Sequence, residues 1–278
     1  MTMAEDQYAV FGNPIAHSKS PDIHGQFASQ TGEALQYTKQ LVAEDQFAAA
    51  AREFFATGGK GLNITVPFKL DAYEFADQLT ERATNAGAVN TLKLEADGSI
   101  IGDNTDGFGM VSDITDNQGW TVKGKRVLVL GAGGAVRGVL QPLLEQNPEL
   151  VVVANRTVAK ADALAEQFKR YGKIAGCGFD ELSGQPFDLV INGTSASLSG
   201  DLPPLPDDLL AEGSCCYDMM YGADLTVFLH WAKERGCSNL ADGLGMLVGQ
   251  AAESFFVWRG VRPEITPVIL SLRSKLSS

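Results

Sequence analysis

Apolar runs and amphipathic stretches alternate along the first hundred residues. Three apolar runs have the length of single strands, and each is followed by a stretch with the spacing of a helix. The predicted strands are 8–11, 35–42 and 61–66, and the predicted helices begin at Pro21, Asp45 and Pro67. Residues 88–101, with Asp97-Gly98 near the middle, have the pattern of a hairpin. This βα repeat predicts an α/β domain with its own mostly parallel sheet.

A second series of strands and helices begins at residue 106. A helix is predicted from 106 to 119, and strands are predicted at 127–130, 150–154, 187–192 and 215–220. Two apolar helical stretches, 246–258 and 267–276, end the sequence. A chain of 278 residues is long enough for two domains. We therefore expect two α/β domains that meet near residue 106.

The turn after strand 127–130 is rich in glycine and reads Gly131-Ala132-Gly133-Gly134-Ala135. Glycines let the backbone turn tightly and approach a pyrophosphate, while the free N–H groups of the following helix face the anion. A strand, this turn, a helix and a second strand predict a Rossmann-like dinucleotide-binding unit. Val136 stands where the motif usually has a third glycine, so close packing of helix on strand depends on the clearance left by Gly134 and Ala135.

The residues after the second strand of this unit select the cofactor. An NAD site usually has an acidic residue there for the ribose hydroxyls, whereas this chain has Asn155-Arg156-Thr157. Arg156 offers a planar cation for a 2′-phosphate, which favours NADP over NAD. The alternative interpretation is a solvated loop arginine without a ligand.

Composition narrows the class of partner. The formal net charge of -12 argues against nucleic acid and anionic membranes, since both attract clustered Lys and Arg. A small anionic substrate then has to be held by local hydrogen-bond donors. No basic leader and no apolar run of membrane length is present, so we expect a cytoplasmic protein. The four cysteines lack metal-ligand spacing and the three histidines are scattered, so we expect free thiols and no metal site.

Lys69 is the candidate proton donor for a nicotinamide-dependent reduction, because hydride arrival at a ketone makes an alkoxide. It lies where strand 61–66 gives way to a helix. The helix dipole there eases the loss of a proton from a lysine, and a nearby carboxylate opposes it. Asp106 can supply that carboxylate and orient Lys69. An exposed surface lysine and an aspartate that caps the next helix are the structural alternatives, and the capping and catalytic roles of Asp106 are compatible.

Two serines lie at the predicted start of the first helix. Ser20 precedes Pro21, which is typical of an N-cap, but that interpretation leaves Ser18 unexplained. Two hydroxyls beside free N–H groups can hold a carboxylate. Gln250, on the apolar helix 246–258, needs hydrogen-bond partners if it is buried, and a substrate hydroxyl is one candidate.

Together these segments resemble the shikimate dehydrogenase family, and the resemblance spans nearly the whole chain. The segments are HSKSP from His17, NITVPFK from Asn63, GAVNT from Gly87, GDNTDG from Gly102, the glycine turn, NRT from Asn155 and DGLGMLVGQ from Asp242. The resemblance implies reversible, NADPH-dependent reduction of 3-dehydroshikimate to shikimate in aromatic amino-acid (chorismate) biosynthesis. It also implies a substrate-binding domain of residues 1–105 completed by the helices of 243–278, and an NADP-binding Rossmann-like domain of residues 106–242.

The resemblance further implies a role for each matching residue. Lys69 and Asp106 form the catalytic pair. The substrate carboxylate is held by Ser18, Ser20, Thr65 and Tyr221, and the ring hydroxyls are read by Asn63, Asn90, Asp106 and Gln250. The cofactor pyrophosphate lies on Gly131, Ala132, Gly133, Gly134 and Ala135, and its adenosine phosphate end on Asn155, Arg156 and Thr157. The ribose and nicotinamide are approached by Thr194, Ser195, Met219 and Gly243.

Two alternatives remain open from the sequence. A quinate/shikimate dehydrogenase tolerates an extra ring hydroxyl and often uses NAD, which Arg156 without an adjacent acid disfavours. A ligand-sensing relative without activity need not keep both Lys69 and Asp106, and this chain has both. Monomer and homodimer are equally compatible with the sequence.

Overall fold

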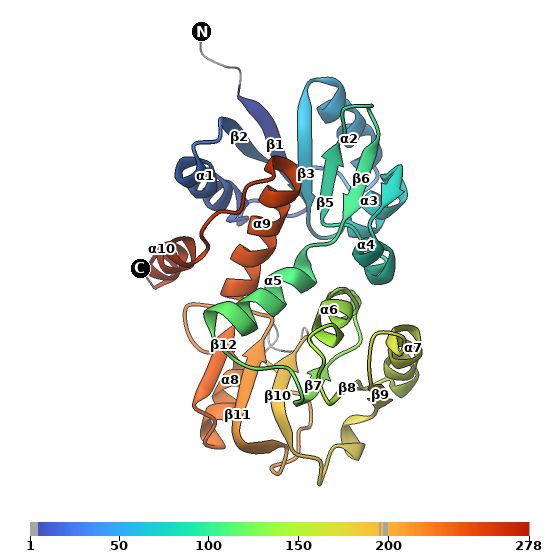
Figure 1. The fold of residues 1–278 in the computed structure, drawn as a ribbon, viewed down its shortest axis with the longest axis vertical. Coiled ribbons are helices and arrows are strands. Elements are labelled where there is room, and N and C mark those ends of the chain that lie inside the picture. Colours follow the sequence, from blue (N-terminus) through green and yellow to red (C-terminus); the bar gives the residue numbers. More distant parts are fainter. Residues whose placement is uncertain (1–4, 195, 197–199, 278) are drawn as a thin grey trace. The chain divides into compact units, whose positions relative to one another are not determined.

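The computed structural model describes residues 5–194, 196 and 200–277. The chain divides into two compact units, drawn in Figure 1. The first unit comprises Met1–Gly109 and Val248–Val268, and the second comprises Met110–Leu247 and Ile269–Ser278. Among the described residues no helix is long and apolar enough to cross a membrane. All four cysteines are free thiols, as the sequence predicts.

The first unit is built on a six-stranded sheet in the order β2-β1-β3-β5-β6-β4. Its strands are β1 Asp6–Gly12, β2 Leu35–Leu41, β3 Gly59–Ile64, β4 Gln78–Leu79, β5 Thr91–Leu94 and β6 Ile100–Asp103. Its helices are α1 Ser20–Thr31, α2 Phe47–Ala56, α3 Lys69–Phe75 and α4 Glu81–Ala86, with parts of α5 Asp106–Ser112 and α9 Leu244–Arg259. Only β5 runs against its neighbours in this sheet, so the predicted mostly parallel sheet is confirmed.

Strand register brings residues that are distant in sequence to one edge of this sheet. Val10 pairs with Asn63, Asn63 with Thr91, and Thr91 with Asp103. Because β5 is antiparallel, its first residue Thr91 pairs with Asn63 near the end of β3 and with Asp103 at the end of β6, and β1 ends on the same side of the sheet because it is parallel to β3. The loops that carry Ser18, Lys69, Asn90 and Asp106 therefore start or end at the same edge.

Helix α9 packs on the first sheet through Trp258. Its indole N–H donates to the carbonyl of Leu92 at 3.0 Å. A Cβ at Gly61 would lie 2.4 Å from Nε1 of Trp258, so the strand below the indole needs a residue without a side chain. The contact fixes α9, and with it Gln250, against β3 and β5.

The second unit is a six-stranded, wholly parallel sheet in the order β12-β11-β10-β7-β8-β9. Its strands are β7 Arg126–Leu130, β8 Leu150–Ala154, β9 Ile174–Cys177, β10 Phe187–Asn192, β11 Leu210–Asp218 and β12 Asn239–Asp242. Its helices include α6 Gly134–Leu144, α7 Val158–Phe168 and α8 Val227–Glu234, and parts of α5, α9 and α10 Thr266–Leu276 also fall in this unit. From the central pair β7 and β10 the strand order runs outward in both directions, to β8 and β9 on one side and to β11 and β12 on the other. This is the strand order of a dinucleotide-binding domain, so the Rossmann-like prediction is confirmed.

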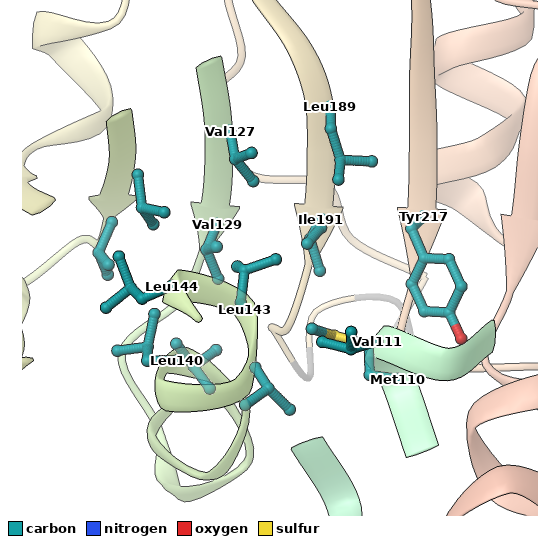
Figure 2. Close-up of a cluster of buried hydrophobic side chains, with 14 of the residues drawn as sticks. Met110, Val111, Val127, Val129, Leu140, Leu143, Leu144, Leu189, Ile191 and Tyr217 are labelled. Atoms are coloured by element: carbon teal, nitrogen blue, oxygen red, sulfur yellow. The ribbon is translucent and has the colours of Figure 1, made fainter. Parts of the chain in front are cut away.

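Alternating side chains of the second sheet make two apolar layers. Val127 and Val129 of β7 belong to the layer that includes Leu140 and Leu143 of α6, and Figure 2 shows these side chains facing one another. The neighbouring Leu128 and Leu130 belong to the opposite layer. Helices therefore cover both faces of this sheet, as a buried parallel sheet requires.

Val136, the departure from the glycine motif, is fully buried in the first of these layers. A Cβ at Gly193 would lie 2.4 Å from its Cγ2. A Cβ at Gly134 would meet nothing within 4 Å, so the clearance that α6 needs is provided by Gly193 at the end of β10, and the expectation that Gly134 provides it is wrong.

Several elements differ from the sequence prediction. Helix α3 begins at Lys69 and not at Pro67, because residues 65–68 form a turn that contains a cis peptide bond between Val66 and Pro67. Strands β4 and β9 and helices α4, α7 and α8 were not predicted. The two strands have two and four residues, too few for a period-2 pattern to stand out.

Candidate active site

Lys69 and Asp106 form an ion pair at the edge of the first sheet. The Nζ of Lys69 lies 2.5 Å from Oδ2 of Asp106. Lys69 is the first residue of α3 and Asp106 is the first residue of α5. The lysine side chain is 33% exposed and the aspartate side chain 15%. The ammonium group is therefore within reach of a ligand, while the carboxylate is largely enclosed.

Asn90 holds the other oxygen of this carboxylate. Its Nδ2 donates to Oδ1 of Asp106 at 2.8 Å and lies 3.3 Å from Oε1 of Gln250. The side-chain oxygen Oδ1 of Asn90 accepts the N–H of Thr105 at 3.0 Å. The two carboxylate oxygens of Asp106 thus bind the side chains of Lys69 and Asn90, and its N–H donates to Oδ1 of Asn104 at 3.2 Å. Its capping role stays a prediction.

An ion-pair network anchors the strand that leads to Asp106. Arg82 donates to both carboxylate oxygens of Asp103, at 2.7 and 2.6 Å, and to Glu253 of α9 at 3.0 Å. Burial alone would raise the pKa of Asp103, but the hydrogen bonds and charge of Arg82 outweigh it and lower that pKa. Asp103 stays ionised and ends β6 in a fixed position, three residues before Asp106.

Ser18 and Ser20 lie together at the start of α1. The Ser18 hydroxyl accepts the N–H of Ser20 and donates to its Oγ, both at 3.3 Å. Ser20 is the first residue of the helix, and the N-cap residue Lys19 makes no side-chain capping bond. The interpretation of Ser20 as an N-cap is therefore wrong, and Ser18 is the hydroxyl that binds a helix N–H.

The buried side-chain amide of Asn63 is hydrogen-bonded to four other side chains. Its amide nitrogen donates to Ser254 Oγ at 2.9 Å and to Thr91 Oγ1 at 3.2 Å. Its amide oxygen lies 2.8 Å from the Tyr37 hydroxyl and 3.1 Å from Nε2 of His24. The side chain is 6% exposed, and both ends of the amide have protein partners.

Thr65 and Tyr221 are the other two residues predicted to bind the substrate carboxylate. Thr65 follows β3 and is half-buried, with its N–H bonded to the carbonyl of Phe11 at 3.0 Å. Tyr221 belongs to the second unit and is 37% exposed. Burial raises the pKa of its phenol, and the charge of Asp242 adds to that effect. Its contact with a substrate carboxylate stays a prediction.

A pocket of about 760 Å³ lies over the glycine turn of the second unit. The predicted residues that line it are Gly131, Ala132, Gly133, Gly134, Ala135, Asn155, Arg156, Thr157 and Thr194. Gly131 has a φ of 102°, a left-handed conformation that favours glycine. Helix α6 begins at Gly134 without a side-chain cap, and a Cβ at Gly133 or Gly134 would meet nothing within 4 Å. Its first N–H groups can therefore serve an anion in the pocket.

The remaining cofactor residues fall beside this pocket or outside the described part of the chain. A Cβ at Gly193, which lines the pocket, would lie 3.0 Å from Sδ of Met219. A Cβ at Gly243 would lie 2.2 Å from the carbonyl oxygen of Met219, so Gly243 allows these two segments to meet. Ser195 lies outside the described residues.

The chemistry of the pocket lining fits NADP. Arg156 and Lys160 bring two cations to it, in a protein with a net charge of -12. Asn155 Nδ2 donates to the carbonyl of Thr157 at 2.9 Å, which shapes the loop that carries Arg156. No acidic residue stands at positions 155–157 to bind the ribose hydroxyls of NAD. The pocket offers donors for a pyrophosphate at one part and cations for a further phosphate at another.

Sequence reasoning missed several residues that the structure places at these sites. Lys160 lines the pocket, and its position three residues after Thr157, in the first turn of α7, is a signal that could have found it. Phe179 and residues 201–204 also line the pocket, without a local pattern that marks them. In the first unit the missed residues are His24, Tyr37, Thr91, Thr105 and Ser254.

Comparison with known proteins gives a consistent result across the chain. The family model for the shikimate dehydrogenase substrate binding domain matches residues 10–92, that for shikimate / quinate 5-dehydrogenase matches 113–199, and that for the shikimate 5'-dehydrogenase C-terminal domain matches 243–269. The curated shikimate dehydrogenase (NADP(+)) of Cellvibrio japonicus is 64% identical over 98% of each chain. That of Saccharophagus degradans is 57% identical over 96% of this chain and 99% of its own.

Two solved structures are similar to this chain over nearly its whole length. An Ael1 enzyme from Pseudomonas putida is 50% identical and superimposes with a TM-score of 0.92, covering 96% of this chain and 98% of its own. Shikimate 5-dehydrogenase from Thermus thermophilus, solved in complex with NADP(H) and shikimate, is 32% identical with a TM-score of 0.85, covering 98% and 100%.

Proposed function

This chain belongs to the shikimate dehydrogenase family, and we propose that its Lys69 and Asp106 transfer the proton in the NADP-dependent interconversion of 3-dehydroshikimate and shikimate. The activity follows from near full-length identity of 54–64% to curated NADP-dependent shikimate dehydrogenases. It makes the protein an oxidoreductase of aromatic amino-acid biosynthesis. The roles of individual residues rest on their geometry, and the bond between Lys69 Nζ and Asp106 Oδ2 is the observation that carries them.

NADPH, when bound, supplies the hydride that reduces the substrate carbonyl carbon. The carbonyl oxygen then needs a proton, and the Lys69 ammonium group provides it. Asp106 holds that ammonium group in position and balances its charge, while Asn90 keeps the carboxylate from rotating. In the direction of shikimate oxidation, Lys69 takes the proton from the ring hydroxyl.

The other polar side chains of the first unit orient the substrate. Ser18, Ser20 and Thr65 donate to its carboxylate, to which Tyr221 of the second unit adds a fourth hydroxyl. Asn90, Asp106 and Gln250 bind the ring hydroxyls, and their mutual bonds already fix the positions of these acceptors and donors. Asn63 is the fourth residue that we assign to the ring hydroxyls, and its amide nitrogen also donates to the carbonyl of Asn90 at 3.2 Å and to Ser254 Oγ at 2.9 Å.

The second unit holds the cofactor. The N–H groups of the glycine turn, residues 131–135, bind the pyrophosphate, and the loop 155–157 binds the adenosine phosphate end. Thr194, Ser195, Met219 and Gly243 approach the ribose and nicotinamide. We assign residues 1–105 with 243–278 to the substrate-binding domain and 106–242 to the NADP domain. The compact units have other bounds, since 106–109 fall in the first unit and 243–247 and 269–278 in the second. Four free thiols support a reducing compartment, and we place the enzyme in the cytoplasm.

The test is the initial rate of reduced-cofactor formation by the purified protein, with shikimate plus NADP compared with quinate plus NAD. The family model that matches residues 113–199 covers both substrates by name, and a 5-ketofructose reductase from Gluconobacter shares the fold at 27% identity with a TM-score of 0.86. A large advantage for shikimate and NADP supports the proposal. Comparable rates favour a quinate/shikimate dehydrogenase, and no activity with either pair favours a ligand-sensing relative.

A further inference from the structure

Asn104 lies in the short segment between β6 and α5, and the residue is only 3% exposed. Its amide oxygen Oδ1 accepts the N–H of Asp106 at 3.2 Å, and its amide nitrogen Nδ2 donates to the carbonyl oxygen of Ala88 at 3.0 Å. The two partners determine the orientation of the amide, because an N–H only donates and a carbonyl oxygen only accepts. The side chain therefore joins the main chain at the start of α5 to the main chain of the loop before β5.

The loop that contains Ala88 also binds the main chain of Lys69. The N–H of Val89 donates to the carbonyl oxygen of Lys69 at 2.9 Å. The Val89 side chain is fully buried in the apolar core of the first unit, and a Cβ at Gly102 would lie 2.8 Å from its Cγ2. The start of α3 is therefore hydrogen-bonded to a loop whose position is fixed by packing.

The main chain of Asn90 holds the same loop between two strands of the sheet. Its carbonyl oxygen accepts the N–H of Ile64, the last residue of β3, at 2.8 Å. Its N–H donates to the carbonyl oxygen of Asp103, the last residue of β6, at 3.0 Å. A group that is hydrogen-bonded to residues 88–90 is therefore held in a defined position relative to the sheet.

A continuous path of hydrogen bonds thus connects the main chain of Lys69 to that of Asp106. It leads from the Lys69 carbonyl to the N–H of Val89, and the Asn104 amide then joins the adjacent Ala88 to the Asp106 N–H. The side chains of Lys69 and Asp106 meet in the 2.5 Å ion pair. When Lys69 gives its proton to the substrate it becomes neutral, and its attraction to the carboxylate weakens. The path through Asn104 does not depend on that charge.

We propose that Asn104 is a positioning residue for the proton transfer, which keeps Asp106 at a fixed separation from Lys69 in both charge states of the lysine. The inference rests on the proposed role of Lys69 and Asp106, and it adds a residue that acts through Asp106. Asn90 holds the carboxylate of Asp106, whereas Asn104 holds its main chain. The two asparagines therefore fix different parts of the same residue.

Asn104→Ala tests the proposal, because it removes both contacts of the amide. We expect kcat for shikimate oxidation to fall about tenfold to a hundredfold, since a small displacement of a reacting group is costly, while the KM for NADP stays within about twofold of the parent value. An unchanged kcat in Asn104→Ala would overturn the inference.

Asn239→Ala is the matched control. The Asn239 amide also donates to a main-chain carbonyl, that of Ser214 at 3.3 Å. Asn239 is the first residue of β12, whereas ligands of a parallel sheet bind at the carboxyl ends of its strands. The control variant should keep the kcat of the parent enzyme.

Asn104→Ser separates positioning from simple pairing of the Asp106 N–H. A serine hydroxyl can accept this N–H as the asparagine does, but its shorter side chain does not extend to the Ala88 carbonyl. We expect kcat to fall in Asn104→Ser by about the same factor as in Asn104→Ala. The parent kcat in Asn104→Ser would mean that the contact with Asp106 is sufficient by itself, and would overturn the role of the path through Ala88.

Lys69→Ala and the double variant Lys69→Ala/Asn104→Ala distinguish failure of the inference from failure of the proposed function. If Asn104 acts through the ion pair, the double variant has the same kcat as Lys69→Ala alone. The parent kcat in Lys69→Ala would refute the proposed proton transfer, and with it the basis of the inference. A lowered kcat in Lys69→Ala, combined with an unchanged kcat in Asn104→Ala or with additive losses in the double variant, would overturn the inference alone.

A second readout is the ratio of kcat in H₂O to kcat in D₂O, which grows as proton transfer limits turnover more strongly. The ratio should rise in Asn104→Ala and stay at the parent value in Asn239→Ala. A purely structural effect of Asn104→Ala would reduce the amount of active enzyme in both solvents alike. It would leave the ratio unchanged, and that result would contradict the proposal.

Discussion

Val136 fills the space that a side chain at Gly193 would need, since a Cβ at Gly193 would lie 2.4 Å from Cγ2 of Val136. The bulky residue in the glycine motif and the glycine at the end of β10 are therefore two parts of one packing solution. The relationship preserves close contact between α6 and the sheet, and it keeps the glycine turn at the floor of the cofactor pocket.

We predict that Gly193→Ala lowers the free energy of unfolding by about 1–3 kcal/mol through overpacking against Val136. Denaturant unfolding measures the change. The double variant Gly193→Ala/Val136→Ala should lose less than the sum of the two single variants, because the removed methyl groups free the space that the alanine needs. Additive losses would show that the two residues do not compete for this space.

Arg82→Ala should destabilise the protein by about 3–5 kcal/mol, because it leaves Asp103 ionised and buried without its guanidinium partner. Unfolding in urea is the measurement. Lys93→Ala is the control, since its ion pair with Glu95 is about one third exposed on both sides and is worth less than about 1 kcal/mol. Equal losses in the two variants would contradict the structural role given to Arg82.

The buried His24 should make the free energy of unfolding of the protein depend on pH. Burial lowers the pKa of His24 to about 3, below the ordinary value of 6.5 that applies in the unfolded chain. Between these values the unfolded state binds the extra proton, so stability falls as the pH falls below 6.5. The loss from His24 between pH 7 and pH 5 is about 2 kcal/mol.

His24→Gln isolates this contribution, because a glutamine amide can still donate toward Asn63 but does not titrate. We expect the difference in unfolding free energy between pH 7 and pH 5 to be smaller in His24→Gln than in the parent by that amount. Parallel pH profiles would mean that His24 titrates alike in the folded and unfolded states.

Arg156→Ala should raise the KM for NADP about tenfold or more and leave the KM for NAD nearly unchanged, since a guanidinium–phosphate contact is lost only with the former. Arg170→Ala, on an exposed arginine of the same unit outside the pocket, is the control. A parallel rise of both constants in Arg156→Ala would indicate that Arg156 supports the loop and does not read a phosphate.

Most of the fold could be predicted from sequence because its strands carry local patterns. The continuous apolar run of β7 is typical of a strand that is buried on both faces, and the glycine turn after it is typical of an anion-binding turn. The short strand β4 has no such period and was missed. The start of α3 was wrong by two residues, because a proline suits a turn as well as the first position of a helix.

Some residues of the candidate site could likewise be predicted from the sequence, and others could not. Lys69 and Asp106 could be found from sequence, because each stands at a junction of strand and helix where ligands gather. Tyr37 and Ser254 could not be found, because their contacts with Asn63 join residues 26 and 191 positions apart. Such contacts are produced by strand register and helix packing, and no local pattern of residues encodes them.

The most direct test of the central claim is the turnover of Lys69→Ala with saturating shikimate and NADP, beside Lys60→Ala as a control on an exposed lysine of the same unit. The Lys69–Asp106 mechanism predicts that kcat falls by at least about a hundredfold, that the KM for shikimate changes by only a few fold, and that Lys60→Ala keeps full activity. A kcat for Lys69→Ala equal to that of the parent enzyme would contradict the assignment of the proton transfer to this pair.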